Sequence, residues 1–121
     1  MSEVPGGPLE RVWTFYLDDM IAFAEKALTY CAGLSRDGFI ADGLIFDATI
    51  RNLELIGEAA THIPMSVRDA IPAIPWRQTI AMRNRLIHGY LGIDNDILWS
   101  IIQDDLPLLL THLRELKEQF S

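Results

Sequence analysis

The sequence predicts an all-α fold: an antiparallel up-and-down bundle of four to five helices, in one domain that spans residues 1–121. Half of the residues are hydrophobic and 22% are charged, which is the balance of a globular protein. Apolar residues recur at spacings of three and four in several long segments, and no segment shows the alternation typical of a strand. Short connections join these segments, which favours antiparallel neighbours.

The first predicted helix follows a start that contains proline and glycine, of which residues 1–7 are expected to be flexible. Its apolar positions follow the helical spacing, and Gly33 can end it. These positions are 9, 12, 13, 16, 20, 23, 24, 27, 28 and 31. Residues 34–42 are polar and contain Gly38, so they predict a connection or a short turn of helix.

The second predicted helix runs from Gly43 to Ile63, with a broad apolar surface and a polar stripe that includes Glu58 and His62. Three prolines follow and leave room only for a short helix at residues 66–71. A third helix is predicted from Pro75 to His88. Proline suits the first helical position because the N–H that it lacks is not needed there, and a following glycine can end a helix.

The last predicted helix has Asp94 and Asn95 as candidate N-terminal caps. Its apolar residues alternate steps of three and four, which predicts a seam that packs along a neighbouring helix at a shallow angle. The seam consists of Trp99, Ile102, Leu106, Leu109, Leu113, Leu116 and Phe120. Pro107 is expected to kink this helix without ending it.

The amount of apolar surface in so short a chain predicts a homodimer, because one bundle would leave part of that surface exposed. No apolar run approaches the roughly 18 residues of a membrane span. The start MSEVPGGPLE lacks the basic and apolar regions of a signal peptide. We therefore expect a cytoplasmic protein with no membrane partner, in which the single cysteine, Cys31, is a small core residue.

Charge is distributed unevenly along the chain. The net charge of −7 alone argues against a nucleic-acid partner, since phosphate contacts need Lys or Arg. Residues 1–59 hold ten acidic and four basic residues, and residues 94–121 hold six and two. Residues 60–93, the basic segment, instead hold four arginines, two histidines and one acidic residue. An anionic ligand would bind in this part of the chain.

The string MRNRLIHGY, residues 82–90, gathers the residue types needed to cleave RNA without a metal. Such cleavage requires a base for the 2′-hydroxyl proton, an acid for the leaving oxygen and a cation for the phosphoryl oxygens. His88 suits the proton transfers because the unperturbed pKa of histidine is near 6.5. Arg83 offers a permanently charged fork of donors, and Asn84 adds a neutral donor.

Helix geometry leaves two arrangements of these residues open. Asn84 and His88 are four apart and share a face, whereas Arg83 and His88 are five apart and diverge by roughly 140°. Either the helix end at Gly89 lets His88 turn toward Arg83, or a two-fold dimer brings two copies of the string together.

A purely structural interpretation also stands. In it His88 complements the helix dipole, the arginines pair with Asp94 or Asp96, and Tyr90 is a packing residue.

The string MRNRLIHGYLGID, residues 82–94, resembles the motif of HepT-like toxins in the HEPN superfamily of prokaryotic ribonucleases. The string IRNLELIGEAA, residues 50–60, resembles the second-helix signature of that family. Residues 99–107 resemble its last helix. The resemblance covers roughly residues 9–118, and the combination of strings makes it specific.

The resemblance implies a HEPN-like homodimer with the motif lining a cleft at the interface, and a metal-independent endoribonuclease that acts on tRNA or mRNA and needs no cofactor. Arg83 and His88 would be the catalytic pair, with Asn84 as a supporting polar group. Arg85 is a candidate for RNA contact, and Glu58 a supporting candidate because it lies in the second-helix string.

The resemblance further implies a partner, a small nucleotidyltransferase antitoxin that transfers AMP from ATP to the motif tyrosine, here Tyr90. The nucleotide phosphate would add negative charge and bulk two residues from His88, where substrate phosphate would bind.

The sequence also allows two other interpretations. The bundle could be a non-catalytic subunit that binds nucleotide or substrate for a nucleotidyltransferase, with Arg83 holding phosphate. It could also carry a metal site of Glu58, His62 and His112, because the first two lie four apart on one helix. A solvated polar stripe explains these two residues equally well, so no metal is expected.

Overall fold

The computed structural model describes residues 12–89 and 94–120, with side chains for all of these except residues 87–89. The N-terminal residues 1–7, predicted to be flexible, lie outside this range. Within it the chain forms seven α-helices and one π-helical turn. These are α1 (Val12–Cys31), α2 (Arg36–Ala41), α3 (Gly43–Ala60), α4 (Met65–Ala70), α5 (Trp76–Gly89), α6 (Asn95–Ser100), η2 (Ile101–Asp105) and α7 (Leu106–Phe120).

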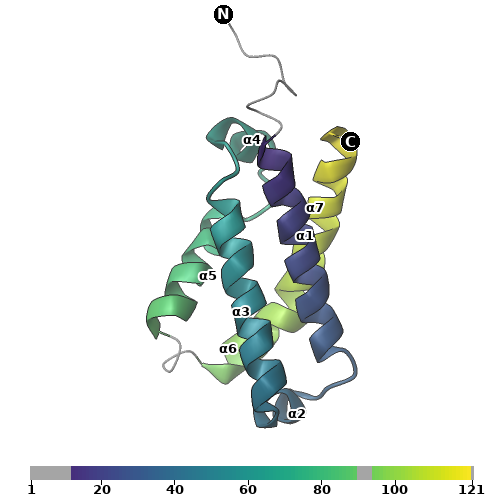
Figure 1. Cartoon of the computed structure of the whole chain (residues 1–121), viewed down its shortest axis with the longest axis vertical. Coiled ribbons are helices and arrows are strands. Elements are labelled where there is room, and N and C mark those ends of the chain that lie inside the picture. The colour runs from purple at the N-terminus through teal and green to yellow at the C-terminus, as the bar shows by residue number, and fades with distance from the viewer. Residues whose placement is uncertain (1–11, 90–93, 121) are drawn as a thin grey trace, which may run out of the picture.

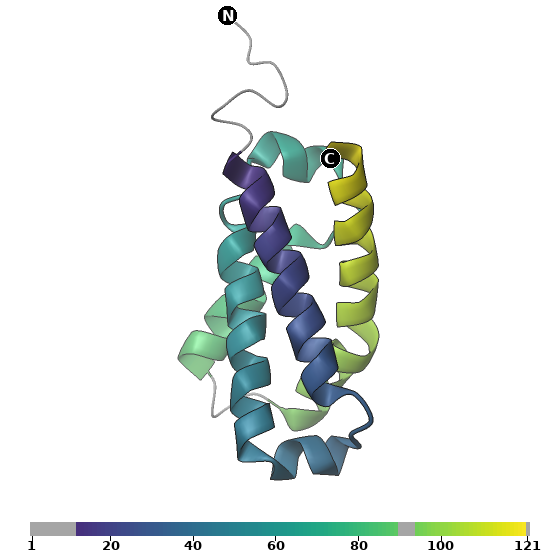
Figure 2. The same cartoon turned by 45° about the vertical axis from the view of Figure 1, so that its right-hand side comes forward.

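The four long helices α1, α3, α5 and α7 run alternately down and up the molecule (Figure 1). Helix α1 packs against both α3 and α7, and α3 also packs against α5. The short helix α4 lies at the end of the bundle where α1 begins and α7 ends, and α2 lies at the opposite end (Figure 2). No strand occurs in residues 12–89 or 94–120, so the predicted all-α bundle is confirmed.

The helix ends follow local signals in the sequence. Beyond α1, Gly33 has φ +77°, a left-handed conformation that glycine adopts without strain. The polar stretch that follows forms α2, capped by Ser35, and Asp42 caps α3 by accepting a bond from Ile45 N at 3.1 Å. Helix α3 ends at Ala60, three residues earlier than predicted. The next residues form a tight turn in which His62 N–H donates to Ala59 O.

The last helix begins where predicted and passes through an irregular turn. Asp94 caps α6 by accepting bonds from the backbone N–H groups of Asp96 and Ile97. In η2 the Leu106 N–H donates to Ile101 O, five residues back, just before Pro107. This wider turn accommodates a ring that would clash with an ordinary helical turn. As predicted, the helix continues past Pro107, and its ribbon changes direction between α6 and α7 (Figure 1).

One hydrophobic core runs through the bundle. Its largest fully buried side chains are Phe39, Leu17, Met20, Leu53, Ile56, Ile63, Ile74, Leu86, Leu98, Ile102, Leu106 and Leu113. Cys31 is buried in this core, as predicted, with Sγ 3.5 Å from Thr49 Oγ1. Burial raises the pKa of the Cys31 thiol, and the hydrogen bond to Thr49 opposes this only in part. The thiol is therefore a packing group and a poor nucleophile.

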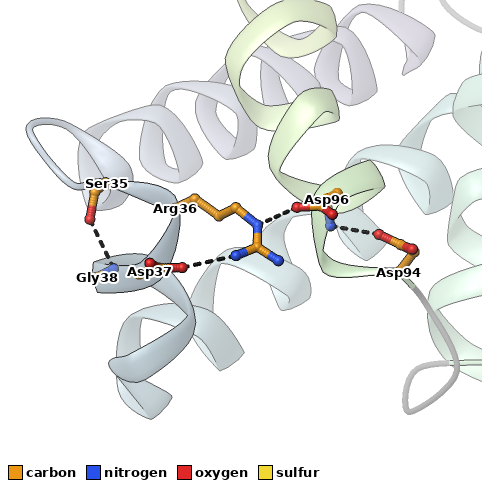
Figure 3. A network of polar contacts seen from close by, with 6 residues as sticks. All are labelled: Ser35, Arg36, Asp37, Gly38, Asp94 and Asp96. Carbon is orange, nitrogen blue, oxygen red and sulfur yellow. Dashed lines mark hydrogen bonds and ion pairs between the residues drawn. The ribbon is translucent and has the colours of Figure 1, made fainter.

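An arginine joins α2 to the start of α6 (Figure 3). Arg36 Nη1 donates to Asp37 Oδ1 at 2.8 Å, and Arg36 Nε forms an ion pair with Asp96. The expectation that arginines of the 82–90 string pair with Asp94 or Asp96 is wrong for Arg83, which pairs with Glu58. Asp94 caps α6, and Asp96 binds Arg36.

Several large apolar side chains remain exposed on the described surface. Examples are Phe15 on α1, Leu44 on α3, Met65 on α4 and Leu108 on α7. A second copy of the chain would cover such surface, and the homodimer stays a prediction. None of the described helices combines the length and the hydrophobicity of a membrane span.

Replacing Gly33 by alanine is expected to destabilise the bundle by about 1–2 kcal/mol, because a Cβ is strained at positive φ. Urea unfolding followed by circular dichroism measures this. The matched control is Gly43→Ala in the first turn of α3, where an added Cβ meets no atom within 4 Å. Equal stability of the two variants would contradict the assignment of strain to Gly33.

Candidate active site

Helix α5 comes close to α3 at Gly57, and this contact places Arg83. A Cβ built at position 57 would lie 2.5 Å from Arg83 Cβ and 2.9 Å from Thr79 O. Both distances are shorter than van der Waals contact, so a side chain at this position would push the two helices apart. Glycine therefore lets the backbone of α5 lie directly on α3, with Arg83 beside the residue that follows Gly57.

That following residue is Glu58, which forms an ion pair with Arg83. Arg83 Nε lies 2.7 Å from Glu58 Oε2, and the two side chains are 34% and 46% exposed. The contact is made at Nε, the guanidinium nitrogen nearest the backbone. The terminal nitrogens, which carry most of the N–H donors, lie farther along the side chain.

The second oxygen of Glu58 faces the turn after α3. His62 Nε2 lies 3.7 Å from Glu58 Oε1. The His62 ring stacks on Tyr16 of α1, with centroids 4.3 Å apart and planes 12° apart. A continuous chain of side chains thus connects α1, α3 and α5, with Arg83 at one end.

The arginines of the basic segment divide into different roles. Arg68 of α4 donates from Nε to Ile63 O at 2.8 Å and from Nη2 to Thr61 O at 3.0 Å, so it binds the carbonyls that follow α3. Arg77 and Arg85 are exposed, and neither has a recorded ion pair with another described residue. The guanidinium groups of Arg77 and Arg85 are therefore exposed to solvent, whereas Arg68 stabilises the turn after α3.

The remaining motif residues lie on α5 or just beyond it. Asn84 is exposed. Helix α5 extends through Gly89, so the backbone at His88 is helical and the positions of Arg83 and His88 diverge by roughly 140° around the helix axis. The side chain of His88 and all of Tyr90 lie outside the described residues.

Of the three residues considered for a metal site, Glu58 and His62 lie beside each other. His112 lies on α7, with Nδ1 4.0 Å from Glu115 Oε1. Among the residues that the structure describes, no group of three or more His, Cys, Asp or Glu side chains is arranged to hold a metal ion. Glu58 instead contacts Arg83.

Comparison with known proteins gives the family. The family model described as "Ribonuclease HepT-like" matches residues 20–116, a range that includes Glu58, Arg83 and His88. The chain belongs to the HepT-like family.

Two curated relatives cover most of the HepT-like chain. The "Probable ribonuclease HepT" of Thermococcus cleftensis is 35% identical over 110 residues, which are 91% of this chain and 100% of that protein. A protein of Methanocaldococcus jannaschii that is named a putative RNase is 37% identical over 92 residues, 76% of this chain and 84% of that protein. No solved structure gives a significant match.

The sequence predicted Glu58 and Arg83 as separate site residues but did not predict the ion pair between them. The signal available was Gly57, a glycine in the interior of a helix, where it lowers helix stability unless close packing requires it. The stacking of Tyr16 on His62 depends on the packing of α1 against α3, and no local pattern encodes it.

Gly57→Ala is expected to lower the free energy of unfolding by about 1–3 kcal/mol, because the added methyl group must separate α5 from α3. Urea unfolding measures the loss. Gly43→Ala on the same helix is the control, since its Cβ meets no atom within 4 Å. Wild-type stability of Gly57→Ala would show that the two helices are not held this close.

Proposed function

We propose that this HepT-like chain is a metal-independent endoribonuclease, the toxin of a toxin–antitoxin system, that cleaves tRNA or mRNA at the interface of a homodimer. The observation that supports it most directly is the position of Arg83, a partly exposed arginine fixed on the same helix as Asn84 and His88, in a chain of the HepT-like family. The names of its relatives as ribonucleases support the same reaction.

The proposed reaction is an attack of the 2′-hydroxyl oxygen on the adjacent phosphorus. The bond from phosphorus to the 5′-oxygen breaks, which leaves a 2′,3′-cyclic phosphate and a free 5′-hydroxyl. His88 transfers protons, because the imidazole can both accept and donate one near neutral pH. The terminal nitrogens of Arg83 stabilise the negative charge that grows on the phosphoryl oxygens. Asn84 supplies a further donor, and exposed Arg85 binds flanking phosphate.

Helix geometry supports a site shared by two chains. Positions 83 and 88 lie roughly 140° apart around one helix axis, which favours a phosphate site built from two copies over one built from a single copy. A two-fold axis beside α5 would place His88 of one protomer near Arg83 of the other. Dimer formation is then a condition of activity.

We further propose that a nucleotidyltransferase antitoxin neutralises the site by transferring AMP from ATP to the hydroxyl oxygen of Tyr90, with pyrophosphate as the leaving group. Tyr90 follows His88 by two residues in the sequence. An added nucleotide would bring negative charge and bulk to the place where substrate phosphate binds.

The acidic remainder of the chain supports selective contact with RNA. With −7 net charge and only four basic residues in residues 1–59, most of the surface repels a polyanion. Productive binding is then confined to the basic segment.

His88→Ala is expected to lower the rate of RNA cleavage at least ~100-fold, because general acid–base catalysis contributes about that much. Total cellular RNA is incubated in EDTA with each protein, and product ends are mapped for 2′,3′-cyclic phosphate. His112→Ala, a histidine on α7 beside Glu115, is the control and is expected to cleave at the wild-type rate. Absence of cleavage by folded wild-type dimer with unmodified Tyr90 would favour a non-catalytic binding subunit.

Incubation with the cognate nucleotidyltransferase and ATP is expected to add the mass of AMP to the wild-type chain and to abolish cleavage. Tyr90→Phe should gain no mass and should keep its activity. Tyr30→Phe, which alters an exposed tyrosine of α1, is the control and should be modified as wild type. Mass spectrometry of the intact protein and of its peptides reads the outcome, and AMP on any other residue would refute the role of Tyr90.

A further inference from the structure

We propose that the stacked pair of Tyr16 and His62 positions Arg83 for catalysis by orienting Glu58 between them. The four side chains lie next to one another in the order Tyr16, His62, Glu58 and Arg83, and they come from α1, from α3 and the turn after it, and from α5. This inference rests on the proposed function, since it concerns how the arginine of that site is held.

Glu58 has a neighbouring side chain beside each of its carboxylate oxygens. Oε2 lies 2.7 Å from Arg83 Nε, and Oε1 lies 3.7 Å from His62 Nε2. A surface glutamate with one partner keeps several rotamers, because each rotatable bond adds conformational freedom. Neighbours on both oxygens restrict the plane of the carboxylate, and this plane sets the place where Arg83 Nε lies.

His62 is itself held from two sides. Its ring is stacked face to face on Tyr16, with centroids 4.3 Å apart. Its backbone lies in the turn after α3, where Arg68 binds the carbonyls of the residues before and after it, Thr61 and Ile63. Tyr16 is partly buried against the core, so the stack connects Glu58 to the rigid interior of the bundle.

Folding stability does not account for this arrangement. Ion pairs between side chains as exposed as Glu58 and Arg83 contribute little to the free energy of folding. Alignment of the guanidinium matters much more for chemistry, because a displacement of a catalytic group by about 1 Å can lower a rate ~100-fold. The pair at Nε restrains the guanidinium group, whose terminal nitrogens carry most of its N–H donors.

Steady-state cleavage of one defined RNA tests the chain of contacts. Tyr16→Leu, His62→Ala and Glu58→Gln should each lower kcat roughly 10- to 100-fold and leave KM near the wild-type value. Tyr16→Phe keeps the ring and should keep the rate. Two matched controls should cleave as wild type: Phe15→Leu removes the neighbouring exposed ring, and Glu25→Gln breaks the similarly exposed ion pair with Arg114.

A double variant distinguishes positioning from general damage. If Tyr16 acts through Glu58, then Tyr16→Leu combined with Glu58→Gln should be no slower than Glu58→Gln alone. Rate losses that multiply would show that Tyr16 acts independently and would overturn the proposal. A large rise in KM at constant kcat would overturn it as well, since this would place the aromatic pair in RNA binding.

Nuclear magnetic resonance of arginine Nε–H groups tests the same contacts without any activity. The Arg83 resonance is identified by its loss in Arg83→Lys. It should be sharp in wild type and in Phe15→Leu, and broadened in Tyr16→Leu, His62→Ala and Glu58→Gln. A sharp, unshifted resonance in Tyr16→Leu would refute positioning. This spectrum tests the positioning of Arg83 even if the wild-type protein cleaves no RNA. Absence of cleavage would refute the proposed function and not the positioning.

Discussion

Helix α5 rests on α3 at a distance that a side chain at position 57 would not allow. This close approach determines how far α5 is shifted along α3 and how it is rotated about its own axis. It therefore determines which residue of α5 contacts Glu58. The position of Arg83 in the candidate site depends on that contact. It brings Arg83 to the carboxylate, and the carboxylate in turn lies beside the turn that carries His62.

Several of the few cations of this acidic chain join helices. Ion pairs connect α2 to α6 through Arg36 and Asp96, and α1 to α7 through Arg114 with Glu25 and Lys117 with Asp18. Each such pair is worth little in stability at a water-exposed surface. Together they occupy positive charges that would otherwise be available to a polyanion, whereas Arg77 and Arg85 on α5 are exposed.

The fold could be predicted from the sequence because its signals are local. Helical spacing located the four long helices, and Asp94 and Gly33 marked ends that the structure confirms. The site could be predicted only in part. The string 82–90 identified Arg83 as a candidate, but its contact with Glu58 joins residues 25 positions apart and depends on how α3 and α5 pack. No local pattern in the sequence predicted a role for Tyr16 in the site, since an aromatic residue at a helical spacing predicts only a core residue.

The π-helical turn at η2 bears on how the length of this helix can vary. Leu98, Ile102 and Leu106 are all buried although they are spaced by four, which in a regular α-helix would rotate each by about 40° from the one before. The wider turn absorbs this drift and returns the seam of α7 to the face of α1. The π-helical turn therefore holds one residue more than a regular α-helical turn at residues 101–105 would hold. A homologue lacking one residue there would bury the same seam with unbroken α-helical geometry, so alignments of such chains should place a gap within residues 101–105.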